Sequence, residues 1–461
     1  MQKRGIMKLS GWCWLVTNSI VVAALASGET RPQYGSTLRI ATRIAPQNLD
    51  PADKSQPESS ARRNLTRLMF ETLVIVDDRG RLAPALATSW LAGPGNQRWQ
   101  FWVRRGVKFH DGSLLTPEAA AAAIRAVNPD WSVSAAGDSI VIERDISDPD
   151  LPARLAMPRN SITKRSEGGT LLGTGPFHIT NWQPGKKLSL AADEGYWGGR
   201  AFVDAIEVDL GRATRDQLIA LDLGKADIAE VAVDQSRRAA AEGRRVVSSA
   251  PVELMVLVFG HDKTSAEEGK LRDVLALSID RKSIRDVVLQ GGGEASGGIL
   301  PNWVSGYGFV FPAEQNLTRA QQLRGEVKYA PTWTLGYDAD DPVAHVMAER
   351  IELNARDAGI RLQVTTSTTA DVRLARVTLA SVNGRIALTA AASAVGAPLP
   401  KISGSSADDL YQAENNIVQT QRVIPLFQLP TSFALSIAVK DWDESRDGTL
   451  HLDNVWLGGK P

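Results

Sequence analysis

The sequence offers few side chains whose type and spacing could do chemistry. His110 and Asp111 are adjacent, but a catalytic pair of this kind needs a nucleophile or a metal ligand beside it, and the neighbouring sequence supplies neither. Ser161 and Lys164 fit the Ser-x-x-Lys spacing of acyl-transferring serine enzymes, yet the partner elements Ser-Asp-Asn and Lys-Thr-Gly are missing. The five histidines are scattered singly, which argues against a zinc site of clustered ligands. We therefore expect no catalytic residue, no metal site and no cofactor.

The region that holds the His-Asp pair is predicted to be structural. Residues 99–104 alternate with the period of two that is typical of a half-buried strand. Asp111 and Gly112 favour a tight turn, because Asp can bond its own backbone and Gly tolerates positive φ. Thr116 is suited to be the N-cap of a helix that contains 119–123.

Length and composition indicate a globular chain of two or three domains. The 461 residues, of which 43% are hydrophobic and 23% are charged, suffice to bury a large core. With 52 basic and 52 acidic residues, no net field favours nucleic acid or an anionic membrane. The twelve tryptophans raise the odds of a binding cleft, because Trp is commonly used in packing or in binding walls.

The first 26 residues are predicted to be an export signal that is cleaved near Ala26. A basic start leads into an apolar run at 20–26, which ends in the small-x-small sequence Ala-Leu-Ala. The apolar run is too short for a membrane anchor, which is the alternative. Either Met1 or Met7 could be the start of the chain.

Removal of this signal leaves a chain suited to the periplasm. The signal takes three of the 52 basic residues and no acidic one, so that 49 basic residues face 52 acidic ones. The only cysteine, Cys13, goes with it, and a chain without cysteine fits an oxidising compartment. Trp12 precedes that cysteine, where lipoprotein processing requires Gly or Ala, so the sequence argues against a lipid anchor.

Several segments, in a fixed order, resemble a known family. They are LAPALATSW at 82–90, WQFWVRRGVKFHDG at 99–112, GTGPF and YWGG within 173–199, LRDVLALSIDRKSIRDVV at 271–288 and AERIELNARDAGIRLQV at 348–364. Together they resemble the extracytoplasmic solute-binding proteins of the peptide and nickel class (family 5), which are receptors of ABC importers. The resemblance implies a two-lobed α/β fold of the periplasmic-binding-protein type (type II, cluster C) with a reduced extra middle domain.

The resemblance also implies the division of the chain. Lobe I would comprise 27–250 and 431–461, with a small inserted domain at about 52–165, and lobe II would comprise 251–430. The apolar segments 252–259 and 423–427 would cross between the lobes, and the first of them has the continuous apolar run of a strand that is buried on both faces. Residues 127–155 are fewer than the family usually has there, so we expect a trimmed inserted domain.

Four residues are candidates for ligand binding. Arg159 matches an arginine that faces the ligand in nickel-type receptors, and at a pocket wall it could hold a carboxylate with two parallel bonds; an exposed surface arginine is the alternative. Trp303 stands where relatives approach the cleft, as a binding wall or as a packed tryptophan. Ser60 and Arg63 belong to the Ser- and Arg-rich segment 55–63, which we place at the cleft rim, with a solvated loop as the alternative.

Local patterns predict three further features. Residues 64–73 carry apolar side chains at helical spacing and predict a core helix. The glycines within 173–199 are predicted to form turns, because no strand-to-helix phosphate loop surrounds them. Residues 290–298 hold five glycines, but Ser296 breaks the Gly-x-Gly-x-x-Gly pattern, so they predict a flexible loop.

The predicted function is that of a monomeric periplasmic receptor. It would capture a peptide or a carboxylate-bearing metal chelate between its lobes and deliver it to ABC transporter permease subunits, with closure as a population shift. Residues 365–406 are polar and alanine-rich, and they lack the Trp-x-x-Asp-x-x-Asp-Pro element with which relatives often hold the ligand's amino group. This argues against a peptide held at its amine. The alternative is a homologue whose shortened second lobe no longer serves transport, and which recruits a membrane partner as a sensor.

Overall fold

The computed structural model describes residues 31–459 apart from 54, 56, 57, 78, 79, 342, 403, 405 and 444. The predicted export signal therefore lies outside the described residues. Within them, every helix is too short or too polar to cross a membrane.

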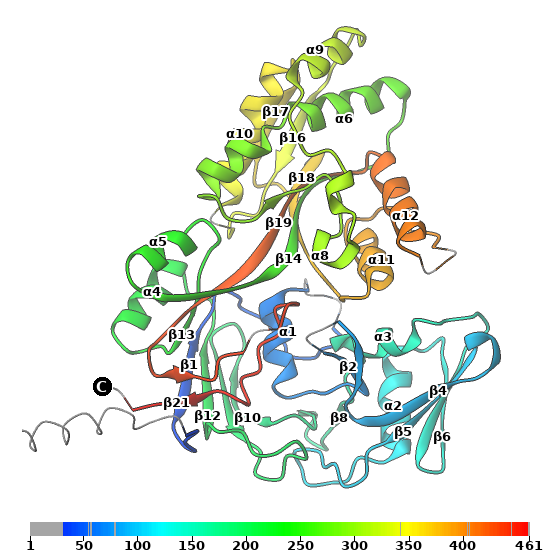
Figure 1. Ribbon diagram of the computed structural model, residues 1–461, viewed down its shortest axis with the longest axis vertical. Helices are drawn as coiled ribbons and strands as arrows, with labels where there is room; N and C mark the ends of the chain where they lie inside the picture. Colours follow the sequence, from blue (N-terminus) through cyan, green and yellow to red (C-terminus); the bar gives the residue numbers. More distant parts are fainter. Residues whose placement is uncertain are drawn as a thin grey trace, which may run out of the picture.

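One mixed sheet of eleven strands runs through two lobes (Figure 1). In spatial order its strands are β10 (Phe177–Gln183), β11 (Lys187–Ala192), β12 (Ala205–Asp209), β1 (Thr37–Ala41), β13 (Ile228–Glu230), β19 (Val423–Leu435), β14 (Arg245–Phe259), β18 (Val372–Thr378), β16 (Thr332–Gly336) and β17 (Arg361–Thr365), and β15 (Glu294–Ala295) pairs with β19. The long strands β14 and β19 pair antiparallel along most of their length and pass from one lobe into the other. They contain the two predicted crossing segments. The predicted domain boundaries themselves stay a prediction.

Lobe I is built around the first five of these strands. β1 pairs in parallel with both β12 and β13, and β11 pairs antiparallel with β12. Side chains such as Leu38, Phe177, Leu190 and Ile206 are fully or almost fully buried and form its core. The helices of this lobe are α1 (Ser60–Arg67), α4 (Thr214–Asp222) and α5 (Ser236–Ala241).

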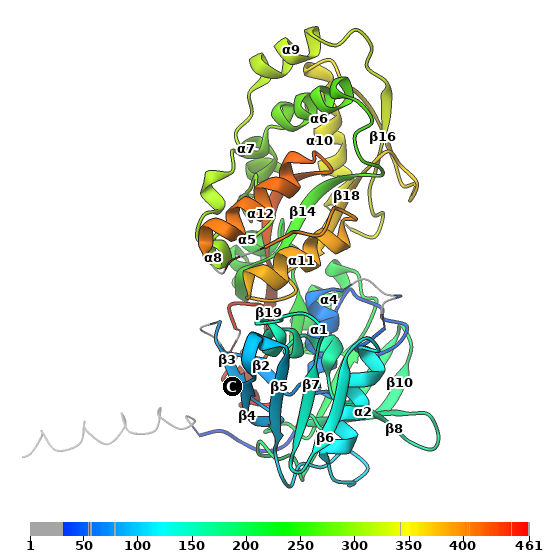
Figure 2. The same cartoon turned by 90° about the vertical axis from the view of Figure 1, so that its right-hand side faces the viewer.

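A small domain adjoins lobe I on one side (Figure 2). It is an antiparallel sheet in the order β4 (Ala87–Ala92), β5 (Arg98–Val103), β7 (Ser139–Glu143) and β6 (Ser132–Ala136), with helices α2 (Pro117–Val127) and α3 (Leu151–Leu155). The predicted alternation in β5 is confirmed, because Trp99, Phe101 and Val103 are buried. Thr116 is the N-cap of α2, and its side chain accepts from the Ala119 N–H at 3.2 Å.

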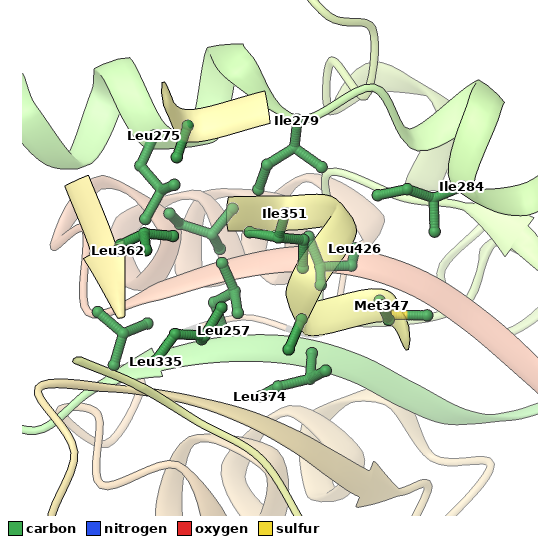
Figure 3. Packing of buried hydrophobic residues seen from close by; sticks show 14 of the residues in the cluster. Leu257, Leu275, Ile279, Ile284, Leu335, Met347, Ile351, Leu362, Leu374 and Leu426 are labelled. Carbon is green, nitrogen blue, oxygen red and sulfur yellow. The ribbon is translucent and has the colours of Figure 1, made fainter. Parts of the chain in front are cut away.

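Lobe II sandwiches the other half of the sheet between two groups of helices. On one face lie α6 (Ala266–Ser278), α9 (Leu317–Gly325) and α10 (Ala344–Asp357), and on the other lie α8 (Asn302–Ser305), α11 (Gly384–Ala394) and α12 (Ala407–Gln419). Figure 3 shows the first of these interfaces, where sheet residues Leu257, Leu374 and Leu426 face Met347 and Ile351 of α10. The two-lobed α/β fold is thus confirmed.

The remaining elements are short. They are the strand pairs β2 (Val74–Val76) with β3 (Leu82–Pro84), β8 (Lys164–Arg165) with β9 (Leu171–Leu172) and β20 (Val439–Lys440) with β21 (Trp456–Leu457), the one-turn helix α7 (Arg281–Ser283), and the turns Pro94–Asn96, Pro158–Asn160, Ile284–Val288 and Gly308–Val310.

The helix that was predicted at 64–73 has different bounds in the structure. α1 begins at Ser60, because Ser59 adopts an extended conformation and its side chain accepts from the Arg62 N–H at 3.2 Å, as an N-cap does. It ends at Arg67, so its apolar continuation is buried without being helical. The predicted bounds were wrong, because the cap was not recognised.

His110 ties the small domain to lobe I and has a structural role. Its Nε2 lies 3.1 Å from the Gly175 carbonyl oxygen, and its backbone N–H donates to the Gly173 carbonyl at 3.0 Å. Gly173 lies outside any turn and Gly175 lies in a bend, whereas Gly185, Gly195 and Gly198 lie in turns, as predicted. Gly173 and Gly175 are needed for close approach: a Cβ at Gly175 would lie 2.7 Å from the Leu68 carbonyl oxygen. The glycines at 291–293 are likewise packed against Val233, Arg237 and Leu429, where a flexible loop was predicted.

Glu71 is a buried carboxylate that accepts from three neutral donors. Its Oε1 accepts from the Tyr196 hydroxyl at 2.8 Å, and its Oε2 accepts from Trp197 Nε1 at 2.9 Å and from the Thr174 hydroxyl at 2.8 Å. Burial raises the pKa of Glu71 to about 7, although the three hydrogen bonds oppose the shift.

This carboxylate should make the protein less stable as the pH rises. The folded pKa is raised above the ordinary value of 4.5, so between these values the folded state holds the proton and the unfolded state does not. The free energy of unfolding should therefore fall between about pH 4.5 and 7, by up to about 3 kcal/mol. In Glu71→Gln, which can keep all three contacts if the Tyr196 hydroxyl accepts from the amide, this part of the pH dependence should disappear. Urea unfolding at pH 5, 6, 7 and 8 measures the free energy of unfolding of both proteins. If this free energy changes with pH equally in the wild type and in Glu71→Gln, the raised pKa of Glu71 is contradicted.

Candidate functional site

A polar cavity lies between the lobes, beside the crossing strands. Its volume is about 80 Å³. The charged and hydroxyl side chains in its wall include Arg43, Ser60 and Glu230 of lobe I, Asp341 and Arg376 of lobe II, and Glu253 of β14. Because both lobes supply its walls, a molecule bound there would contact both.

Arg376 is the centre of an ion-pair network on the lobe II side. Its Nε and Nη2 donate to the two oxygens of Asp341, and its Nη1 donates to Glu253 Oε2 at 3.1 Å. Burial alone would lower the pKa of Arg376, but Glu253 and Asp341 raise it above its ordinary value. Burial alone would raise the pKa of Asp341, but Arg376 holds it below its ordinary value. Arg376 and Asp341 are therefore both charged at neutral pH.

The lobe I side holds a second carboxylate and a bridging arginine. Glu230 Oε2 accepts from the Thr42 hydroxyl and from the Arg43 backbone N–H, each at 3.0 Å. The side chain of Arg43 reaches across to lobe II, where its Nη1 donates to the Asp340 carbonyl at 2.9 Å. This bond closes one edge of the cavity.

Further contacts hold the lobes together in this conformation. Asp150, which precedes α3 of the small domain, accepts from Arg385 Nε of α11 at 2.7 Å. Asn383, the N-cap of α11, lies 3.4 Å from the same carboxylate. The conformation is thus closed, with direct bonds between the two lobes.

The structure places the two predicted rim residues in the first turn of α1. Ser60 lines the cavity and is 2% exposed, and its hydroxyl has no hydrogen-bond partner among the described residues. Arg63 is 3% exposed, and it donates to the Leu379 carbonyl of lobe II at 2.8 Å and to the Asp447 carbonyl at 3.3 Å. The solvated-loop alternative is wrong for both residues.

Trp303 lies apart from this cavity. It packs against the lobe II core, and its Nε1 donates to the Pro251 carbonyl at 2.7 Å. The guanidinium of Arg446 lies 5.3 Å from the ring centroid. Together they line a separate space of about 210 Å³ between the lobes. The packed-tryptophan alternative describes these contacts, and a role in ligand binding is untested.

Arg159 lies in the turn Pro158–Asn160, which contacts α1. It is half-buried, and within the part of the chain that the structure describes its guanidinium makes no hydrogen bond or ion pair. It is not among the residues that line the polar cavity. The structure thus brings Ser60 to the cavity and leaves Arg159 and Trp303 at other places.

Sequence reasoning missed all five charged residues that line the cavity. Arg43, Glu230, Glu253, Asp341 and Arg376 come from five separate segments of the chain. One signal was available in β18, where Val372 and Leu374 face the core. The next position on the same face is Arg376, although the two-residue period predicts an apolar residue there.

The geometry supports neither a serine acyltransferase site nor a metal site among the described residues. Lys164 Nζ donates to Asp111 Oδ2 and to the Ser113 hydroxyl, each at 2.8 Å, while the Ser161 hydroxyl donates to the Pro158 carbonyl. The Ser-x-x-Lys pair is therefore engaged elsewhere. Among residues 31–459, leaving out the undescribed positions, no three His, Cys, Asp or Glu residues are grouped so as to hold a metal ion.

Comparison with known proteins identifies the family. The family model described as bacterial extracellular solute-binding proteins, family 5 Middle, matches residues 81–394. The chain belongs to this family. Family 5 comprises solute-binding proteins, not enzymes.

The relatives of this family 5 chain are distant in sequence. The nickel-binding protein NikA of Staphylococcus aureus is 22% identical over 315 residues, which are 64% of this chain and 64% of that protein. The probable D,D-dipeptide-binding periplasmic protein DdpA of Escherichia coli is 23% identical over 287 residues, 56% of this chain and 55% of that protein. The match therefore spans less than two thirds of the length of either relative.

Solved structures of family 5 relatives share the fold over nearly the whole chain. The structure of NikA from Staphylococcus aureus in complex with Ni(L-His)2 has a TM-score of 0.78 at 17% identity, covering 92% of this chain and 100% of that chain. The periplasmic binding protein DppA from Helicobacter pylori, in complex with the peptide STSA, has a TM-score of 0.78 at 19% identity, covering 93% and 99%. At such identities the likeness shows the fold alone.

Proposed function

We propose that this family 5 protein is the substrate-binding receptor of an ABC importer, and that it captures a peptide or a carboxylate-bearing metal chelate between its lobes. The observation that supports this most is the polar cavity whose charged walls come from both lobes. A group of the ligand that enters this cavity would add contacts that exist only in the closed form, and so would shift the population toward closure. Permease subunits would recognise that closed form.

The proposal includes the cellular compartment and the oligomeric state of the protein. The chain would be exported, cleaved near Ala26 and active in the periplasm as a monomer. Two relatives are named for a nickel ligand and for a D,D-dipeptide, which fits the proposed ligand classes.

Binding is tested with ligand panels. Thermal shift and calorimetry against dipeptides, tripeptides and nickel–histidine chelates should yield at least one binder, which at a hundredfold excess over its dissociation constant stabilises the protein by about 2.7 kcal/mol. Free nickel is the control for adventitious metal binding. A panel without a binder would overturn the proposal. A pull-down that returns permease subunits would support import, whereas one that returns only a signalling membrane protein would favour the sensor alternative.

Arg159 remains the proposed carboxylate ligand of this receptor. Its guanidinium near α1, which has no partner among the described residues, supports the role, since it keeps its donors for a carboxylate. Arg159→Ala should lose about 1.5 to 3 kcal/mol of affinity for a carboxylate-bearing ligand, as measured by calorimetry. Arg105→Ala is the control, because that side chain is 86% exposed and lies in the small domain. Equal affinities for wild type and Arg159→Ala would remove the role.

A further inference from the structure

The wall of the polar cavity carries more negative than positive charge. Arg43 and Arg376 face three carboxylates, those of Glu230, Glu253 and Asp341, so one negative charge is left without a counter-charge. Arg376 already donates three of its five N–H groups to Asp341 and Glu253, so its positive charge is opposed within the wall itself. An anion in this cavity would meet a like-charged wall, which is unfavourable at short range.

Two carboxylate oxygens in this wall are free to accept. Glu230 uses only Oε2 for its bonds to Thr42 and Arg43, and Glu253 uses only Oε2 for its bond to Arg376. No residue among those described donates to the Oε1 atom of either carboxylate. Asp341 differs, because both of its oxygens accept from Arg376. The free acceptors come from β13 and β14, which belong to different parts of the cleft wall.

Ser60 supplies an independent sign of a missing partner. Its hydroxyl is buried in the wall of the same cavity and makes no hydrogen bond within residues 31–459, the undescribed positions aside. Buried polar groups are almost always paired in native proteins. A hydroxyl can accept a hydrogen bond from a cationic donor, just as the free carboxylate oxygens can.

We propose that the ligand presents an ammonium or guanidinium group to this cavity, where Glu230, Glu253 and Ser60 bind it. The inference rests on the proposed function, and it names the chemical class that the site selects. A protonated head group has several N–H donors and no acceptor, which matches the free acceptors of the wall. The volume of about 80 Å³ leaves room for such a head group and excludes a bulky side chain while the lobes are closed.

The charge requirement is tested with pairs of probes that have the same shape. Calorimetry compares Nα-acetyl-L-arginine with Nα-acetyl-L-citrulline, and Nα-acetyl-L-lysine with Nα-acetyl-L-norleucine. Acetylation removes the α-ammonium group that the free amino acids share, so only the first member of each pair carries a cation. The cationic member of at least one pair should bind about tenfold tighter or better, because a charged hydrogen bond is lost in its partner. Glu230→Gln should reduce this preference to about threefold or less, since it removes the uncompensated charge and keeps an acceptor for the backbone.

A matched variant separates this effect from net charge. Glu143→Gln removes the same charge from β7 of the small domain, where the side chain is 56% exposed, and should leave the preference unchanged. Ser60→Ala should bind the cationic probe about fivefold more weakly, while the thermal midpoint of the ligand-free protein stays the same or rises. A purely structural hydroxyl would instead lower that midpoint when removed.

Two outcomes would overturn the inference. One is equal binding of the cationic and neutral members of both pairs, and the other is a preference that survives Glu230→Gln. If a peptide or chelate still binds in either case, the proposed function stands and only the cation site falls. If neither these probes nor the peptide and chelate panels bind, both proposals fail.

Discussion

Arg376→Met should destabilise the protein by about 3 kcal/mol at pH 7, because it leaves two carboxylates in the cleft wall without their counter-charge. Asp341 loses both of its charged bonds, and its side chain is only 6% exposed. Breaking a buried ion pair costs about 3 to 5 kcal/mol of stability. We expect the low end of this range, since the side chain of Arg376 is itself 26% exposed. Urea unfolding measures the effect.

The contribution of Asp341 to the pH dependence of stability should change sign in Arg376→Met. In the wild type the pKa of Asp341 is lowered, so the stability from this pair is present above the ordinary value of 3.8 and is lost as the pH falls. In the variant the largest remaining influence on Asp341 is burial, which raises its pKa, while the Val343 N–H and the charge of Arg43 still oppose the shift. Part of the lost stability should therefore be regained as the pH falls. The difference between the two proteins should therefore narrow toward pH 4.

Arg373→Met is the matched control for this experiment. Arg373 lies in the same strand with an exposed side chain, and it makes no ion pair among the residues that the structure describes. Its loss should change the free energy of unfolding by about 0.5 kcal/mol or less. Equal losses for the two variants would mean that the network around Arg376 contributes no more than a surface arginine.

The elements that sequence reasoning predicted well are those with strong local signals. The alternation of β5 and the apolar run of β14 follow from side-chain burial along a strand, which needs no knowledge of distant residues. The end of α10 also has a local cause, because Gly359 has a φ of 81° and thus adopts the left-handed conformation that glycine favours. In each case the residue type and its local role determine the structure.

The elements that it missed depend on partners far away in the chain. β18 and α11 lie in the segment 365–406, whose polar and alanine-rich composition gave no clear period. Arg63 reads locally as a solvated residue, yet it is buried because it binds carbonyl groups at positions 379 and 447. Long-range bonds of this kind override local propensity.

The cleft could not be assembled from the sequence for the same reason. An ion pair such as that of Arg376 with Glu253 joins residues that are 123 positions apart, and only the fold shows which arginine is neutralised and which carboxylate keeps a free oxygen. The resemblance placed Ser60 at the rim of the cleft, and in the structure Ser60 lines the polar cavity. It gave no reason to choose Glu230 among 52 acidic residues.

The last prediction concerns the closest backbone approach in lobe I, at Gly173. A Cβ there would overlap the carbonyl oxygen of Met69 and lie 2.6 Å from Cδ1 of Phe70. Neither atom can move freely, because the Met69 carbonyl accepts from the Gly175 N–H at 3.0 Å and Phe70 is 2% exposed. Gly173→Ala should therefore destabilise the protein by about 3 kcal/mol or more, as overpacking against fixed neighbours does.

Gly325→Ala shows what the same substitution does where space is available. Gly325 ends α9, has no positive φ, and a Cβ there would meet no atom within 4 Å. Alanine has the higher helix propensity, so this variant should be neutral or more stable by up to about 1 kcal/mol. If Gly173→Ala unfolds at the same urea concentration as Gly325→Ala, the segment 173–175 packs less closely against 68–70 than we describe. A large difference would mean that the GTGPF signature exists for packing, because it lets the chain pass the end of α1 at backbone distance and so fixes the helix whose first turn lines the cleft.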